Sequence, residues 1–241
     1  MDRMPALMLS AMLAAPHRTA VRENGDVAQR EAISLSYVPL PITPRCEHHM
    51  AMPAIDGHRW TAEEVRALPD QPGKRFECVD GELLVSPGPR LPHQSAMFLL
   101  SRALDAYCTV SGVGSVFNGP GELELDRYTL VQPDVFVLPL VGGKRARSQE
   151  EAGQPLLFVE VLSPSTARHD RVVKRGRYQR YGVEYWILDL DARLAERWTP
   201  DTRAPEIVLE TLLFHPGAAS APLLIELQAL IDEALGERQV P

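Results

Sequence analysis

Two carboxylates stand inside apolar runs of the sequence, where a charged residue is not expected. Asp134 lies in Val-Gln-Pro-Asp-Val-Phe-Val, and Glu160 lies in Leu-Leu-Phe-Val-Glu-Val-Leu. Both runs are typical of buried central strands, and an ionised carboxylate there is costly unless it is paired or binds a metal. Side by side, the strands would offer both carboxylates to one hard cation, Mg²⁺ or Mn²⁺. The alternative is that each carboxylate lies at a strand end and forms a salt bridge with an arginine.

A lysine lies downstream of the second carboxylate. Lys174 follows Glu160 by fourteen residues, in a stretch with helical spacing, and Tyr178 lies one turn later on the same face. Hydrolysis of a phosphodiester needs a metal that generates hydroxide and a cation that offsets the developing negative charge. Asp134, Glu160 and Lys174 supply these parts, and we predict that they are catalytic. The alternative for Lys174 is an ordinary lysine on a helix surface.

The overall composition is that of a globular protein. Of the 241 residues, 45% are hydrophobic and 24% are charged, which suits one sizeable domain or two small ones. The formal net charge of -7 at pH 7 argues against a grip on nucleic acid over the whole surface, because such binding needs many Lys and Arg contacts to phosphate. Any contact with DNA must therefore be local.

The local concentration of positive charge is the stretch 165–181, which is predicted to be a helix ending at Gly182. It holds six Lys and Arg residues against one Asp. Arg168, Arg171 and Arg175 are at helical spacing, so a phosphate backbone lying across the site would find them on one side. We expect these three and Tyr178 to contact nucleic acid. A solvated charged helix face is the alternative.

Residues 1–52 mix Met, Ala, Pro and Arg without a sustained period, and we interpret them as a disordered extension ahead of a folded domain of residues 53–241. A start codon assigned too far upstream would give the same pattern. Residues 5–15 are similar to a short signal peptide, and Cys46-Glu-His48-His49 lacks the second ligand pair of a structural zinc site. The three cysteines show no CxxC spacing, and no run reaches the roughly 18 apolar residues of a membrane span. We expect a protein of the reducing cytoplasm with no membrane partner.

The remaining elements follow from period and turn signals. Thr61 and Glu64 have capping-box spacing ahead of a short helix, and Asp80-Gly81 is a type I′ turn dipeptide between two strands. The expected strands are 76–79, 82–85, 122–126, 131–138, 156–162, 183–190, 193–198 and 207–214, and the expected helices are 93–110, 165–181 and 223–235, with a charged loop at 142–153.

Five short blocks of the sequence, taken together and in order, carry a resemblance. They are Phe76-Glu-Cys-Val-Asp-Gly-Glu82, Val131-Gln-Pro-Asp134, Val159-Glu-Val-Leu-Ser-Pro-Ser-Thr166, Lys174 with Tyr178, and Gly182-Val-Glu-Tyr-Trp186. This pattern resembles the Uma-type family of restriction-endonuclease-like proteins over roughly residues 59–200. Cys78 stands where the family often has an aliphatic residue.

The resemblance implies an α/β (α+β) fold of the PD-(D/E)xK type, a restriction-endonuclease-like mixed β-sheet flanked by helices. Pro133-Asp134 matches its "PD" and Glu160 its acidic residue. The usual lysine two residues later is replaced by Leu162, and Lys174 matches the place to which the lysine migrates in this family. The resemblance further implies that Glu77 and the backbone carbonyl of Val161 join Asp134 and Glu160 as metal ligands, and that DNA is the substrate.

Two other functions fit parts of the pattern. A pair of carboxylates also serves a glycosidase, but a sugar site usually needs stacking aromatics, and only 6% of the chain is aromatic. A nuclease fold that no longer cuts, and serves as a nucleic-acid-binding or interaction module, is the second. Cutting both strands of a duplex usually takes two copies of such a domain, so we expect a homodimer.

Overall fold

The computed structural model describes residues 57–217, 219 and 221–237. The predicted extension of residues 1–52, with its signal-like segment and its Cys-His cluster, lies outside the described residues. Within the part that is described, no helix combines the length and the hydropathy that a membrane crossing requires.

A small antiparallel sheet begins the described chain. Helix α1 (Ala62–Arg66) starts at Thr61 with the expected capping box, in which the Thr61 hydroxyl accepts from the backbone N–H of Glu64. Strands β1 (Lys74–Val79) and β2 (Glu82–Pro87) form the predicted hairpin. Asp80 (φ +53°) and Gly81 (φ +89°) both take the positive φ of a type I′ turn. Strands β4 (Leu123–Asp126) and β5 (Thr129–Val131) complete the order β2-β1-β5-β4.

A six-stranded mixed sheet forms the centre of the fold. Its order is β10 (Glu206–Val208), β9 (Leu194–Trp198), β8 (Glu184–Asp189), β7 (Leu157–Val161), β6 (Val135–Pro139) and β3 (Gly114–Asn118). The β7–β8 pair is parallel and its other neighbouring pairs are antiparallel. A parallel pair needs a crossover connection, which here runs through a π-helical turn, η1 (His169–Lys174), and helix α4 (Arg175–Tyr181). The mixed α+β fold class is therefore confirmed.

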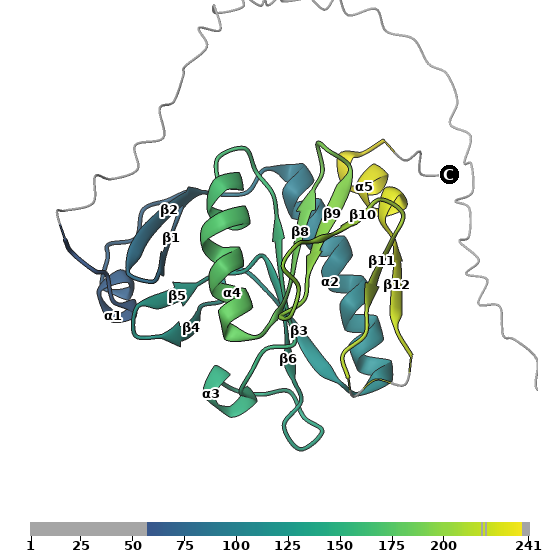
Figure 1. The fold of residues 1–241 in the computed structure, drawn as a ribbon, viewed down its shortest axis with the longest axis horizontal. Coiled ribbons are helices and arrows are strands. Elements are labelled where there is room, and N and C mark those ends of the chain that lie inside the picture. Colours follow the sequence, from purple (N-terminus) through teal and green to yellow (C-terminus); the bar gives the residue numbers. More distant parts are fainter. Residues whose placement is uncertain (1–56, 218, 220, 238–241) are drawn as a thin grey trace, which may run out of the picture. The chain divides into compact units, whose positions relative to one another are not determined.

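Helices cover both faces of this sheet (Figure 1). Helix α2 (Leu91–Ser111), helix α5 (Leu227–Leu235) and the ribbon β11 (Thr211–Phe214) with β12 (Leu223–Glu226) pack on one face, against a core that includes Val135, Val137, Val159 and Trp186. Alternate residues of the same strands, such as Phe136 and Phe158, pack with Tyr178 of α4 on the other face. Because successive residues of β6 and β7 point to opposite faces of the sheet, the sheet separates two apolar cores.

Several predicted elements are wrong in detail. The strand expected at 131–138 is two strands in two different sheets, because Pro133 has no N–H to donate to a ladder and breaks the run. The strand expected at 207–214 is β10 and β11, and the first residues of the helix expected at 223–235 form β12 instead. Two elements have no counterpart in the prediction: β3 and the short helix α3 (Gln149–Ala152), which lies in the expected loop.

Candidate active site

The antiparallel register of β6 and β7 brings Asp134 opposite Glu160. Val135 pairs with Val159 and Phe136 with Phe158, so one further step along the ladder sets the two acids side by side. The backbone N–H of Val161 donates to Asp134 Oδ2 at 2.9 Å. Asp134 and Glu160 are 1% and 3% exposed, which places both carboxylates in the interior.

Three donors hold the Asp134 carboxylate. Arg75 Nη1 lies 2.9 Å from Oδ1, and His93 Nε2 lies 3.0 Å from Oδ2, where the Val161 N–H also points. Burial alone raises the pKa of a carboxyl group, but the hydrogen bond and charge of His93, the charge of Arg75 and the Val161 N–H outweigh it. They lower the pKa of Asp134 from 3.8 to about 2. Asp134 is therefore ionised at neutral pH.

Lys174 joins three acids. Its Nζ lies 2.8 Å from Glu77 Oε2, 2.9 Å from Glu160 Oε1 and 3.7 Å from Asp170 Oδ1. Burial lowers the pKa of an ammonium group, but the charges of Glu160 and Glu77 raise the pKa of Lys174 well above its usual value. Lys174 is a buried cation and not a lysine on a helix surface.

The π-helical turn η1 sets the position of Lys174. Asp170 and Lys174 are four residues apart in η1, and both are buried, so this turn carries its polar side chains toward the sheet. Single π-turns of this kind are rare and occur frequently at functional sites. One turn later in α4, the Tyr178 hydroxyl lies 3.5 Å from Glu160 Oε1, at the limit of a weak hydrogen bond.

Glu77 is anchored from the small sheet. Its Oε1 accepts the backbone N–H of Gln132 at 2.7 Å, while its Oε2 faces Lys174. Arg75, two residues earlier on β1, lies on the same face of the strand and reaches Asp134. The segment 132–134, which joins β5 to β6, therefore links the small sheet to the large one at the acid cluster.

The cluster contains more acids than fixed cations. Four buried carboxylates, those of Glu77, Asp134, Glu160 and Asp170, face two side chains that stay charged at neutral pH, Lys174 and Arg75. Burial and the charges of Asp134, Asp170 and Glu77 raise the pKa of Glu160 well above 4.5, and Lys174 offsets this only in part. Such an excess of buried negative charge favours taking up a proton or a cation.

The donor chemistry suits a hard cation, since carboxylate oxygens are the ligands that Mg²⁺ and Mn²⁺ prefer. The present side-chain arrangement is closed, because Lys174 contacts Glu160 and Glu77 while His93 and Arg75 contact Asp134. Among residues 57–217, 219 and 221–237, no three His, Cys, Asp or Glu side chains are grouped as a metal site. The residues fit a metal by chemistry, and Lys174 or His93 would have to move for one to bind.

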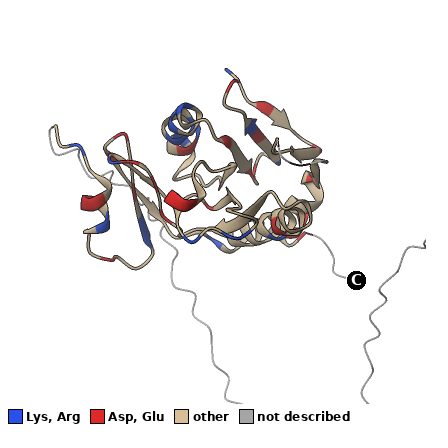
Figure 2. Cartoon of the chain, turned by 90° about the horizontal axis from the view of Figure 1, so that it is seen from below, with Lys and Arg blue, Asp and Glu red and all other residues tan. Residues whose placement is uncertain are grey.

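The arginines that were expected to contact nucleic acid differ in their surroundings. Arg168 is exposed. Arg171 Nη2 lies 2.8 Å from Asp189 Oδ2 and its Nε lies 2.5 Å from Glu196 Oε1, so that arginine already has acidic partners. The guanidinium of Arg175 lies over the ring of Trp198, 4.9 Å from its centroid. Figure 2 shows basic positions gathered on α4, beside strands that carry both acidic and basic positions.

Tyr178 does not fit its expected role in this structure. The side chain is fully buried, with its ring edge-on to Phe158 and Tyr185. A nucleic-acid backbone cannot reach a ring enclosed in this way. Its contact with Glu160 makes it a support of the acid cluster instead.

Three residues of the cluster, Arg75, His93 and Asp170, were not among those expected from the sequence. His93 was expected to begin a helix, whereas α2 begins at Leu91 and His93 lies in its first turn. Nothing in the local pattern pointed to a carboxylate 41 residues away. Arg75 precedes Glu77 by two residues in an expected strand, so the shared strand face was available as a signal. Asp170 precedes Lys174 by one helical turn, which is likewise a signal at the level of spacing.

Comparison with known proteins agrees with this geometry. The family model described as "Uma2: Putative restriction endonuclease" matches residues 62–229, well over half of the chain. The chain belongs to the Uma2 family. No curated relative matches the sequence.

A solved structure shares the fold of this Uma2-family chain. It is the crystal structure of a putative nuclease belonging to DUF820 from Anabaena variabilis, with a TM-score of 0.58 and 18% sequence identity. The match covers 73% of this chain and 99% of that one. This likeness establishes the restriction-endonuclease-like fold of the described domain.

Proposed function

We propose that this chain is a metal-dependent endonuclease that hydrolyses phosphodiester bonds in DNA. One observation carries the proposal: the buried Lys174 contacts Glu77 and Glu160, while Asp134 lies across the ladder from Glu160. Burying acids and a lysine from three different elements costs free energy of folding, so this cluster is better explained by a function than by a contribution to stability. Membership of a family of restriction endonucleases supports nuclease function for the same residues.

In this proposal Asp134 and Glu160 hold a divalent cation, with Glu77 and the carbonyl of Val161 as further oxygen ligands. The bound cation, Mg²⁺ or Mn²⁺, would lower the pKa of water and stabilise charge on the phosphate. Lys174 stays protonated because its pKa is raised, and it gives up one carboxylate contact to orient the attacking water or to offset phosphoryl charge. Arg168, which is exposed at the start of η1, would contact the phosphate backbone.

The second candidate is a nucleic-acid-binding module that does not cut. The closed arrangement favours it, because each acid of the cluster already has a cationic or N–H partner. The two candidates differ in one measurable respect, since only the nuclease requires a divalent cation and the cluster residues for cleavage.

The experiment is cleavage of supercoiled plasmid by the purified full chain with Mg²⁺, Mn²⁺ or chelator. Wild type is compared with Glu160→Gln, Lys174→Met and the matched control Lys144→Ala, whose lysine lies on an exposed turn. We expect metal-dependent nicking that both cluster variants abolish and the control retains. Circular dichroism of each variant verifies folding. Nicking that survives in the folded Glu160→Gln protein would refute the assignment, and folded wild type without cleavage in either metal would favour the silent module.

We also propose that the active form is a homodimer, since cutting a duplex takes one site for each strand. Light scattering coupled to gel filtration, with and without duplex DNA, tests this. A monomer in both conditions that still linearises plasmid in one step would contradict it.

A further inference from the structure

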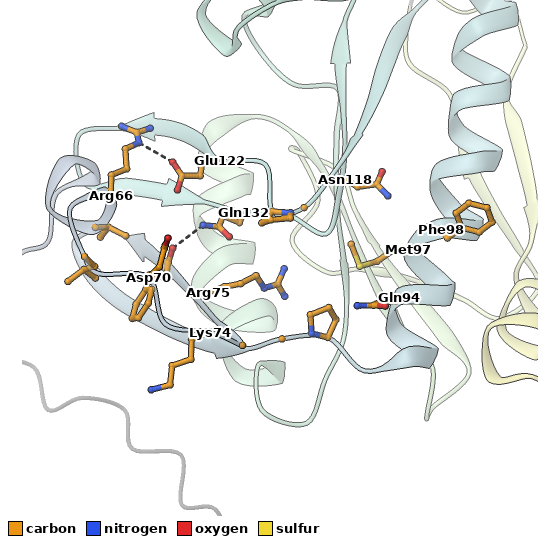
Figure 3. A pocket seen from close by; sticks show the side chains of 18 residues that line it. Arg66, Asp70, Lys74, Arg75, Gln94, Met97, Phe98, Asn118, Glu122 and Gln132 are labelled. Atoms are coloured by element: carbon orange, nitrogen blue, oxygen red, sulfur yellow. Dashed lines mark hydrogen bonds and ion pairs between the residues drawn. The ribbon is translucent and has the colours of Figure 1, made fainter.

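A cavity of about 650 Å³ lies beside the acid cluster, between the small sheet with α1 and the N-terminal half of α2. Figure 3 shows Gln94 and Met97 of α2 facing Arg75 of β1 across it. The strand that supplies Arg75 also supplies Glu77, so one wall of the cavity is also an element of the proposed active site. Volumes of about 300–1,000 Å³ are typical of ligand pockets, which is room enough for one or two nucleotides.

Arg75 connects the cavity to Asp134. It lines the cavity, its Nη1 lies 2.9 Å from Asp134 Oδ1, and its Nε is buried without a hydrogen-bond partner among the described residues. Gly119 lines the cavity next to Arg75: a Cβ there would lie 3.0 Å from the Pro133 carbonyl and 3.7 Å from Arg75 Nη1. The cavity therefore extends to the guanidinium that holds Asp134.

One face of α2 presents mixed chemistry to the cavity. Met97 and Phe98 follow Gln94 by three and four residues, so each lies one turn from it, and all three line the cavity. Phe98 is 61% exposed although it is large and apolar. The amide groups of Gln94, Asn118 and Gln132 also line the cavity, so an aromatic ring stands among groups that can both donate and accept hydrogen bonds.

Lys74 and Arg75 supply positive charge on the opposite wall, which also holds Asp70 and the ion pair of Arg66 with Glu122. Lys74 is exposed, and its ammonium contacts the neutral side chain of Gln71 at 2.9 Å. The other basic surface, on η1 and α4, is less available because Arg171 is held by Asp189 and Glu196. Proteins bind unpaired nucleic acid in grooves that combine exposed aromatic rings, amide groups and cations.

We propose that this cavity binds a single-stranded segment of nucleic acid, with a base on Phe98 and its phosphate near Lys74 and Arg75. The proposal rests on the proposed nuclease function, because it leads the strand to Asp134 through Arg75. The face of an aromatic side chain can stack only on a base whose own face is free, as in an unpaired strand. A continuous duplex keeps its bases stacked on one another and cannot use Phe98 in this way.

The test is fluorescence anisotropy of the full chain with labelled twelve-nucleotide oligothymidine, oligouridine and a twelve-base-pair DNA duplex, in chelator so that no cleavage occurs. Phe98→Ala is paired with Val110→Ala, a residue of the same helix that is 91% exposed and does not line the cavity. Lys74→Ala is paired with Lys144→Ala. All four positions are exposed, so we expect truncation to leave the fold intact, and circular dichroism checks this.

We expect single strands to bind more tightly than the duplex, and Phe98→Ala to weaken that binding about tenfold, as loss of one stacked base does. Lys74→Ala should weaken it severalfold and reduce its dependence on salt, while Val110→Ala and Lys144→Ala bind as wild type. A preference for oligothymidine or for oligouridine shows which of the two, deoxyribose with thymine or ribose with uracil, binds more tightly, and either result supports the cavity assignment. Equal binding of duplex, or wild-type binding by Phe98→Ala, overturns it.

The binding assay and the plasmid assay can fail independently, so they test the cavity assignment and the nuclease proposal separately. If Phe98→Ala binds single strands normally while nicking still requires Glu160, the cavity assignment is wrong and the nuclease stands. If Phe98→Ala weakens binding but the wild type cuts nothing in either metal, the cavity is a nucleic-acid site and the nuclease proposal is wrong.

Discussion

His93 Nε2 lies 3.0 Å from Asp134 Oδ2, which ties the first turns of α2 to the beginning of β6. The imidazole is 8% exposed, and its Nδ1 has no hydrogen-bond partner among the described residues. A ring in this position fixes the orientation of the carboxylate through one nitrogen. The two residues therefore act as a unit, although 41 positions separate them.

Replacement of His93 should reduce cleavage without removing it. Groups that orient a metal-binding carboxylate typically contribute about 10–100-fold in metal affinity or activity. We expect His93→Ala to lose that much, and to require more Mg²⁺ for half-maximal rate. His93→Gln, which keeps a donor, should restore part of the loss. Titration of cleavage rate against Mg²⁺ measures both effects, and a variant with the wild-type Mg²⁺ dependence would show that His93 is structural only.

Removal of the Lys174 charge should destabilise the fold in a pH-dependent way. Lys174→Met leaves Glu77 and Glu160 buried without their cation, and breaking a buried pair in this way costs about 3–5 kcal/mol. The loss should be smaller at pH 5.5 than at pH 8, because the unpaired carboxyl groups take up protons as the pH falls. Urea denaturation at the two pH values measures it.

The double variant Glu160→Gln with Lys174→Met provides the control. It removes one of the three carboxylates that Lys174 contacts, so it should be more stable than Lys174→Met alone at pH 8. Additive losses from the two substitutions would contradict a direct interaction between these side chains.

Local signals in the sequence predicted the short elements well. The capping box of Thr61 and Glu64 and the positive-φ pair Asp80-Gly81 are determined by residues within four positions of one another. The hydrophobic runs around Asp134 and Glu160 correctly indicated buried strands, and Glu160 lies within β7. Asp134 instead lies just before β6 and pairs with Arg75, which is the strand-end alternative that the sequence left open. What the runs could not show is that Pro133 divides the first run between two sheets, because that depends on which partner each half finds.

The contacts of the site depend on tertiary structure that spacing does not encode. His93 reaches Asp134 only because α2 packs where it does, and Arg171 has acidic partners only because β8 and β9 pass beside η1. The basic stretch was correctly recognised as a helix with positive charge. Whether each arginine is free or paired is set by strands that follow it in the chain.

Arg168 and Arg171 should therefore behave differently in DNA binding. Arg168→Gln is expected to reduce the salt dependence of duplex binding by about one phosphate contact, a slope change of about 0.9. Arg171→Gln should leave that slope unchanged and lower the free energy of unfolding by about 1 kcal/mol, since it breaks a partly exposed ion-pair network. Binding isotherms at four salt concentrations and urea melts separate the two. The reverse pattern would place Arg171, and not Arg168, on the phosphate backbone.

The low pKa of Asp134 predicts that the free energy of unfolding decreases at acid pH. The folded carboxyl has a pKa of about 2 against 3.8, so the folded state binds this proton less tightly than the unfolded state does. The stability that Asp134 contributes is thus present above pH 3.8 and is lost as the pH falls toward 2, for a total of about 2 kcal/mol.

Asp134→Asn cannot titrate, so its free energy of unfolding should fall less steeply than that of wild type between pH 4.5 and 2.5. Urea denaturation at intervals of half a pH unit measures the two slopes. Asp201→Asn, at an exposed position, serves as the control and should follow the wild-type curve. Parallel curves for wild type and Asp134→Asn would mean that Arg75 and His93 do not hold an ionised carboxylate there. The closed arrangement of the cluster would then need a protonated Asp134, and the proposed metal site would lose its principal ligand.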